Sequence, residues 1–235
     1  MIYELARRFM VGVFRLLWRP RVSGLDRVPR SGAVLIASNH LSFSDSMVLP
    51  MLVPRRVTYL AKNDYFTGTG VRGRLTAAFF HATGAVGVKR TGRRDDAIDA
   101  LTTALEVLQE GGAFAIYPEG TRSRDGRLYR GRTGVAWLAL ASGAPIVPTA
   151  LQDTDRLQPI GARLFRFVRV RVTFGPPIDP APWAARLAAG EGAGRVRRDL
   201  TDAVMDAIAA MSGQERAAEY NRPPADDPGL AEPAF

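Results

Sequence analysis

Apolar runs of strand length recur along the chain, and segments with apolar residues at helical spacing lie between them. Six segments are predicted to be strands: 33–38, 56–61, 84–90, 113–118, 144–151 and 167–178. Most are short apolar runs, as in buried strands, whereas the last alternates apolar and polar residues, as a strand with one exposed face does. Helices are predicted over 46–52, 69–81, from Asp95 or Asp96 to Gly111, and over 135–143, 181–189 and 195–211.

This alternation of strands and helices predicts the α/β class, with a mostly parallel or mixed central sheet flanked by helices. A length of 235 residues suits one domain, which is expected over residues 25–212. Residues 213–235 are rich in Pro, Ala and Asp and are predicted to form a disordered tail.

The first twenty residues predict an amphipathic helix, which Pro20 ends, so that residues 1–24 precede the domain. On a helical wheel, the charged residues share an arc of roughly 120° and most apolar residues lie opposite, although Val11 and Trp18 fall in the charged arc. The uncharged runs are too short for a signal peptide or a membrane span. Two interpretations remain: a helix that lies on a membrane surface, or a helix packed on its own domain.

The amino-acid composition limits the classes of binding partner and of site that the chain can have. The net charge is +9, and Lys62 and Lys89 are the only lysines, so arginine carries almost all of the positive charge. A basic surface attracts phosphate groups, whether of nucleic acid, anionic lipid or a phosphorylated small molecule. The absence of cysteine excludes disulfides, thiol catalysis and cysteine-based metal sites.

One of the two histidines, His40, directly follows a predicted strand, and Asp45 comes five residues later. A neutral imidazole can take a proton from a hydroxyl, and a carboxylate on its other ring nitrogen fixes the tautomer. A spacing of five suits a loop that folds back onto the start of the next helix. By itself, the pair is more typical of an ordinary loop than of a catalytic site; His81, beside an apolar run, is a weaker candidate.

A second polar loop follows the predicted strand 113–118 and begins with Glu119, Gly120, Thr121 and Arg122. Glycine permits a tight turn, and the Arg122 guanidinium matches phosphate geometry. The alternative is an ordinary charged surface turn. If the two preceding strands are parallel, both loops leave the same edge of the sheet, where α/β proteins place their sites.

Four blocks in this order resemble the glycerolipid acyltransferase family, in which glycerol phosphate and lysophosphatidate are acylated. "NHLSFSD" is similar to the family's N-H-x4-D block, "GAVGVKR" to its second block, "YPEGTRS" to its third and "IVPTA" to its fourth. The resemblance covers roughly residues 25–180 and implies a glycerol-3-phosphate acyltransferase-like fold.

The resemblance implies a role for each matching residue. His40 would be the general base and Asp45 its partner, while Glu119, Gly120, Thr121 and Arg122 would bind the acceptor, helped by Arg90 on the phosphate. Pro148 would shape the acyl site. Two positions depart from the family pattern: Lys89 stands where Asp is common, and Tyr117 where Phe is common.

The implied reaction moves an acyl group from coenzyme A or acyl carrier protein to 1-acyl-glycerol-3-phosphate, which gives phosphatidic acid and needs no metal or other cofactor. Glycerol 3-phosphate or another lysophospholipid is an alternative acceptor. A membrane-associated enzyme, peripheral or monotopic on the cytoplasmic face of the cell membrane, follows as an expectation. A His-Asp thioesterase and a basic nucleic-acid-binding protein are competing hypotheses, although no nucleic-acid-binding motif is present and no nucleic-acid partner is expected.

Overall fold

The five residues of strand β2, Val34–Ser38, are all buried and form the middle of the molecule. The computed structural model describes residues 11–88, 94–162 and 164–222. Side chains of β2 alternate between two apolar clusters, Val34 and Ile36 in one and Leu35 and Ala37 in the other. A strand that is buried on both faces therefore reads as a continuous apolar run, as this one does.

The sheet has seven strands in the order β1-β7-β6-β2-β5-β3-β4. The pairs β2–β5, β2–β6, β3–β5, β3–β4 and β1–β7 are parallel, while β6–β7 is antiparallel. This confirms the predicted α/β class and mixed sheet. The strand bounds are β1 Arg21–Ser23, β3 Val57–Lys62, β4 Ala85–Val88, β5 Ala113–Ile116, β6 Ile146–Gln152 and β7 Arg171–Phe174.

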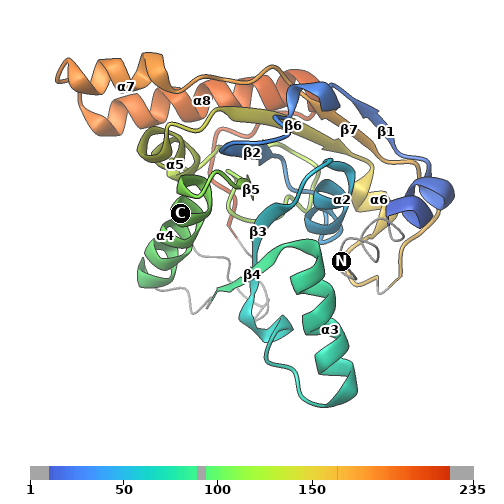
Figure 1. Cartoon of the computed structure of the whole chain (residues 1–235). Helices are drawn as coiled ribbons and strands as arrows, with labels where there is room; N and C mark the ends of the chain where they lie inside the picture. The colour runs from blue at the N-terminus through green and yellow to red at the C-terminus, as the bar shows by residue number, and fades with distance from the viewer. Residues whose placement is uncertain (1–10, 89–93, 163, 223–235) are drawn as a thin grey trace.

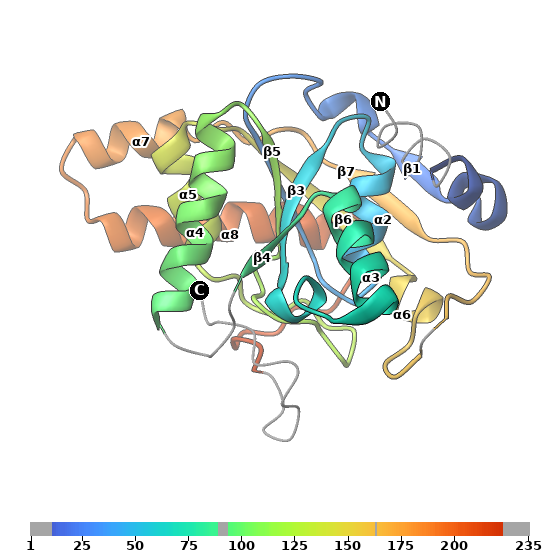
Figure 2. The same ribbon diagram turned by 60° about the horizontal axis from the view of Figure 1, so that its bottom comes forward.

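Helices cover both faces of the sheet (Figure 1). Figure 2 shows α2 and α3 on one side of it and α4, α5 and α7 on the other. The helix bounds are α2 Asp45–Leu52, α3 Gly70–Thr83, α4 Arg94–Gln109, α5 Gly134–Ser142, α6 Thr154–Leu157, α7 Ala181–Ala188 and α8 Ala193–Ser212, with 3-10 turns at Leu25–Arg27 and Asn63–Tyr65. The predicted helices are present, and α6 is an additional short one.

The N-terminal region contains a helix and an edge strand. Residues 11–18 are helical, and β1 follows directly and pairs with β7. The first ten residues of the predicted amphipathic helix lie outside the described residues, so its full pattern stays a prediction. In the described part of the chain, no helix is both long and apolar enough to cross a membrane.

The segment 214–222 packs on the domain, although the sequence places it in the tail. Leu128 N–H donates to the Glu215 carbonyl (2.8 Å), and Ala217 N–H donates to the Leu128 carbonyl (2.9 Å). Ala217 and Asn221 are buried. The folded domain therefore extends past residue 212, and residues 223–235 lie outside the described residues.

Candidate active site

His40 and Asp45 meet at the end of the central strand. His40 lies two residues past β2, and Asp45 is the first residue of α2. The His40 Nδ1 atom lies 2.8 Å from Asp45 Oδ2, and both side chains are buried. When Nδ1 carries the ring proton, its N–H donates a hydrogen bond to the carboxylate. The lone pair of Nε2 can then accept a proton from another group.

The same Asp45 oxygen holds the loop in shape. Oδ2 also accepts the backbone N–H groups of Leu41 (2.7 Å) and Ser42 (2.8 Å). These bonds close the five-residue loop at the N-terminus of α2, where the helix dipole favours a negative charge. The spacing from His40 to Asp45 is therefore the spacing of a closed turn and not of a helix face.

The ring of Tyr117 stacks on the imidazole of His40, with centroids 3.9 Å apart and an interplanar angle of 12°. Tyr117 directly follows β5, the strand next to β2. Its hydroxyl accepts a hydrogen bond from Ser46 Oγ (3.3 Å) on α2. The His40 ring is thus held by a carboxylate at its edge and by an aromatic ring on its face.

Glu119 joins the two polar loops from a fully buried position. Its Oε1 accepts the backbone N–H of His40 (2.9 Å), and its Oε2 accepts the backbone N–H of Tyr129 (2.9 Å). The Ser123 N–H in turn donates to the His40 carbonyl (2.8 Å). Glu119 therefore fixes where His40 lies, and its predicted contact with an acceptor stays a prediction.

Gly120 and Thr121 shape the second loop. Gly120 has a φ of +80°, which favours glycine, and a Cβ atom there would lie 2.8 Å from Arg132 Nε. Thr121 is buried, and its carbonyl accepts a hydrogen bond from Asn221. Neither residue lines the cavity that adjoins the His40 loop.

Asp125 organises the outer part of this loop. Burial raises the pKa of its carboxyl, but hydrogen bonds from Arg127, Tyr129 and Ser123 outweigh this and hold the pKa well below its usual range. The Arg127 Nε–H donates to Asp125 Oδ2 (2.7 Å), and the Tyr129 hydroxyl donates to the same atom (2.9 Å). The carboxylate is thus charged at neutral pH and keeps the turn closed.

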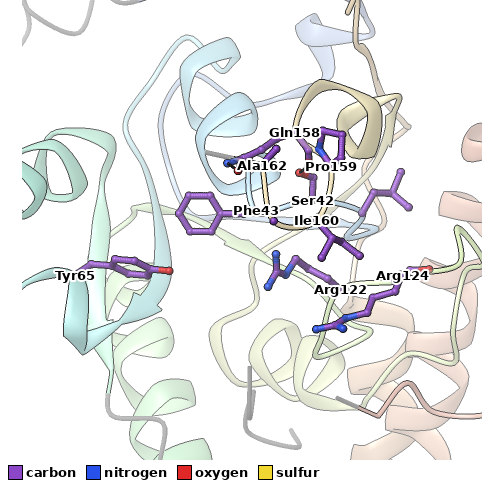
Figure 3. A pocket seen from close by; sticks show the side chains of 12 residues that line it. Ser42, Phe43, Tyr65, Arg122, Arg124, Gln158, Pro159, Ile160 and Ala162 are labelled. Carbon is purple, nitrogen blue, oxygen red and sulfur yellow. Dashed lines mark hydrogen bonds between the residues drawn. The ribbon is translucent and has the colours of Figure 1, made fainter. Parts of the chain in front are cut away.

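A cavity of about 260 Å³ adjoins the His40 loop (Figure 3). Arg122 and Arg124 lie on one side of it, the Phe43 and Tyr65 rings lie on another, and the segment 158–162 covers a third. The remaining lining residues are Leu41, Ser42 and Ser123. The cavity thus combines two guanidinium groups with aromatic and aliphatic walls, which suits a ligand with an anionic and an apolar part.

The other predicted site residues lie elsewhere. Pro148 is buried within β6, opposite Ala37 of β2, and its carbonyl accepts the Gly175 N–H (2.7 Å). A strand residue directs its N–H and C=O to the same neighbour, so the missing N–H of Pro148 removes no bond to β2. Arg90 lies outside the described residues, so its contact with the phosphate stays a prediction.

Sequence reasoning missed three residues that build the site. The Asn39 side chain donates to the Leu151 carbonyl (2.8 Å) and accepts the Leu151 N–H (2.7 Å), which joins the end of β2 to β6. The Ser42 hydroxyl donates to the Gln158 carbonyl (2.8 Å) and ties the loop to a cavity wall. Asn39 belongs to the N-H-x4-D block, so its inclusion there was the available signal; Gln158 had none.

Comparisons with known proteins agree on one family. The profile of the Acyltransferase family matches residues 19–152. A chloroplastic 1-acyl-sn-glycerol-3-phosphate acyltransferase of Brassica napus is 29% identical over 163 residues, covering 68% of this chain and 45% of that protein. The enzyme of the same name from Bacillus subtilis is 25% identical over 185 residues, covering 78% of this chain and 85% of that protein.

A solved structure has the same fold. The crystal structure of the 1-acyl-sn-glycerophosphate acyltransferase PlsC from Thermotoga maritima superposes with a TM-score of 0.62 and 22% sequence identity, covering 88% of this chain and 82% of that one. The chain spans about half the length of the plant relatives that it matches.

Proposed function

The chain belongs to the acyltransferase family, and from this premise we propose that it acylates the free hydroxyl of 1-acyl-glycerol-3-phosphate to give phosphatidic acid. The observation that carries the proposal is the buried His40–Asp45 pair, 2.8 Å apart, beside a cavity that Arg122 lines. The names of the Brassica and Bacillus relatives support the choice of acceptor. The acyl donor is a thioester of coenzyme A or of acyl carrier protein.

The reaction follows from the state of the His40 ring. Nε2 accepts the proton of the acceptor hydroxyl as its oxygen attacks the thioester carbonyl carbon. Asp45 stabilises the imidazolium that forms. The tetrahedral intermediate then expels the thiolate, which takes the proton from His40, so the ester forms, the thioester bond breaks and the enzyme returns to its starting state.

The size and lining of the cavity favour a phosphorylated glycerol. Its volume of about 260 Å³ is below the roughly 300–1,000 Å³ of pockets that enclose drug-sized ligands. It therefore suits the glycerol phosphate part of the acceptor better than a complete lipid with its chain. Arg122 binds the phosphate, and Glu119, Gly120 and Thr121 hold the loop that presents Arg122.

Replacing the cavity arginine tests this assignment. Arg122→Ala should raise the KM for 1-acyl-glycerol-3-phosphate by about 10- to 100-fold, because a hydrogen bond to a charged group contributes about 1.5–3 kcal/mol. The kcat should change less, since the reacting hydroxyl still meets His40. The measurement is steady-state kinetics with purified protein, and Arg156→Ala, at an exposed arginine of α6, is the matched control.

A panel of acceptors separates this reaction from its alternatives. Wild-type protein is offered lysophosphatidate, glycerol 3-phosphate, lysophosphatidylcholine and monoacylglycerol with each acyl donor. The proposal expects the highest kcat/KM with lysophosphatidate. A preference for glycerol 3-phosphate would assign the alternative acceptor, and release of free fatty acid at the same rate with and without acceptor would identify a thioesterase.

The setting of the reaction also belongs to the proposal. Acceptor and product are membrane lipids, so the protein works at a membrane surface, on the cytoplasmic side, where thioester donors are available. The excess of arginine supports this location because an anionic lipid surface attracts positive charge.

A further inference from the structure

Large apolar side chains are exposed on the connection between α6 and β7 and on the N-terminal helix. Two of the most exposed large apolar residues in the described part of the chain are Leu164, at 82% exposure, and Phe167, at 79%. Both lie in the connection between α6 and β7. Leu16 and Leu17, on the N-terminal helix, are exposed as well. Large exposed apolar groups of this kind mark contact surfaces when they form a patch.

Contacts between the two segments bring Phe167 beside the N-terminal helix. The Trp18 ring stacks on the Phe167 ring, with centroids 5.6 Å apart, and meets the Phe165 ring edge to face at 6.1 Å. Trp18 Nε1–H also donates to the Arg166 carbonyl (2.9 Å). Phe167 is therefore held in place by Trp18 while most of its surface faces outward. We define the docking surface as Leu16, Leu17, Leu164 and Phe167.

Exposed arginines lie close in sequence to the residues of the docking surface, and the same segments carry no acidic residues. Arg15, Arg19, Arg166 and Arg169 are exposed. The sequence has no Asp or Glu within 11–19 or within 156–171. Large apolar groups interspersed with arginines are what an anionic lipid surface binds, because the apolar groups enter the acyl region while guanidinium groups meet the headgroups.

The connection that carries Leu164 and Phe167 also builds the cavity. Gln158, Pro159, Ile160, Gly161 and Ala162 line it (Figure 3), and the Gln158 carbonyl is bound by the hydroxyl of Ser42, two residues from His40. Leu164 therefore lies two residues beyond a segment that forms a cavity wall.

We propose that the α6–β7 connection, together with the N-terminal helix, docks onto a bilayer that contains anionic lipid, with Leu164 and Phe167 inserted, and that this docking sets the cavity mouth at the lipid surface. The inference rests on the proposed function, because a lipid acceptor is what gives the arrangement its use. The charge of the neighbouring segments favours a bilayer over a second copy of the chain, which would bring like charges together.

Vesicle binding by the full chain tests the docking surface. Wild-type protein is expected to float with vesicles of phosphatidylcholine mixed with phosphatidylglycerol. The variant Leu164→Ser/Phe167→Ser should bind these vesicles at least about tenfold more weakly, since burying each large apolar side chain is worth roughly that factor. Ile98→Ser, at an exposed residue of α4, is the matched control and should bind as wild type does.

Further variants measure the apolar and the electrostatic contributions to vesicle binding separately. Leu164→Ser alone spares the Trp18–Phe167 contact and should show part of the loss. Arg166→Ala/Arg169→Ala should lower binding on the order of fivefold per arginine when anionic lipid is present. Unchanged vesicle binding by Leu164→Ser/Phe167→Ser would overturn the proposal, as would loss of a dimer in that variant with vesicle binding intact.

An activity measurement separates this inference from the proposed function. With short-chain lysophosphatidate dissolved as a monomer, Leu164→Ser/Phe167→Ser should keep the wild-type kcat/KM, whereas its rate on acceptor embedded in vesicles should fall. If the wild type acylates neither form but still binds vesicles through these residues, the proposed function fails and the docking surface stands. Equal loss on both forms would overturn the docking role.

Discussion

At the scale of single residues, one oxygen atom of Asp45 does two things at once. Oδ2 accepts the His40 ring N–H and the backbone N–H groups of Leu41 and Ser42. The bond that orients the imidazole therefore shares its acceptor with the bonds that close the loop. A carboxamide could place its single oxygen at the same position, but it carries no negative charge to stabilise a protonated imidazole.

Tyr117 is expected to act through its ring. Because the ring stacks on His40 at 3.9 Å, Tyr117→Phe should keep kcat/KM within about twofold of wild type, as the phenylalanine common in the family implies. Tyr117→Ala frees the imidazole to rotate and should lower kcat by about 10²-fold, the loss expected from a misplaced catalytic group. Steady-state kinetics across pH checks both variants.

Comparing the two variants separates the role of the ring from that of the hydroxyl. If Tyr117→Phe loses as much activity as Tyr117→Ala, the link from Ser46 to the Tyr117 hydroxyl (3.3 Å) matters more than the ring. Thermal unfolding of both variants serves as the control, because a loss of activity that follows a loss of fold says nothing about the ring.

The residues that sequence reasoning predicted best are those fixed by local contacts. His40 and Asp45 are five apart, and their contact follows from one short turn. The Asn39 side chain donates a hydrogen bond to Leu151, 112 residues away. The Ser42 hydroxyl donates one to Gln158, 116 residues away. Those pairings depend on how β2 and β6 lie beside each other, and neither segment alone carries that information.

At the scale of elements, the C-terminal segment 214–222 braces the loop that carries Arg122. Asn221 Nδ2 donates to the Arg122 carbonyl (3.0 Å), and Gln214 bonds both Asn39 (2.7 Å) and the Gly126 carbonyl (2.8 Å). The Tyr220 ring lies beneath Arg132, 5.3 Å from its guanidinium carbon. A segment rich in polar residues thus connects both loops of the site.

Removing one brace tests its contribution. Asn221→Ala should cost about 1–2 kcal/mol for its hydrogen bonds and lower Tm by roughly 2–8 °C in a domain of this size. The KM for lysophosphatidate should rise, because the Arg122 backbone is held less firmly. Calorimetry and kinetics check this against Glu219→Ala, which removes an exposed ion pair with Arg127; equal behaviour of the two variants would contradict the brace.

Element predictions succeeded where the apolar pattern is long or continuous. The buried runs of β2 and β5 and the helical spacing of α4 correspond to observed elements. β1 was missed because three residues carry no periodicity. β7 ends earlier than predicted because Gly175 and two prolines follow its last residue, Phe174. The segment 214–222 was assigned to the tail because its composition is polar, although its hydrogen bonds order it.

At the scale of the whole molecule, the parallel arrangement of β2, β5 and β6 brings the loop of His40 and the loop of Arg122 to one edge of the sheet. The sequence predicted this arrangement on the condition that the strands are parallel, because both loops directly follow apolar strands. It could not predict the strand order or the cavity, whose walls come from four regions far apart in the chain. The chemistry of the site was therefore visible locally, while its shape required the assembled fold.

Replacing His40 tests the central claim most directly. Purified wild-type protein, His40→Ala and His81→Ala are given an acyl thioester and lysophosphatidate, and the phosphatidic acid formed is quantified. His81 is exposed on α3, so its variant is the matched control. The account predicts a loss of about 10²- to 10⁴-fold in kcat for His40→Ala, with unchanged circular dichroism and near wild-type activity for His81→Ala. Phosphatidic acid formed by folded His40→Ala at a rate close to wild type would contradict it.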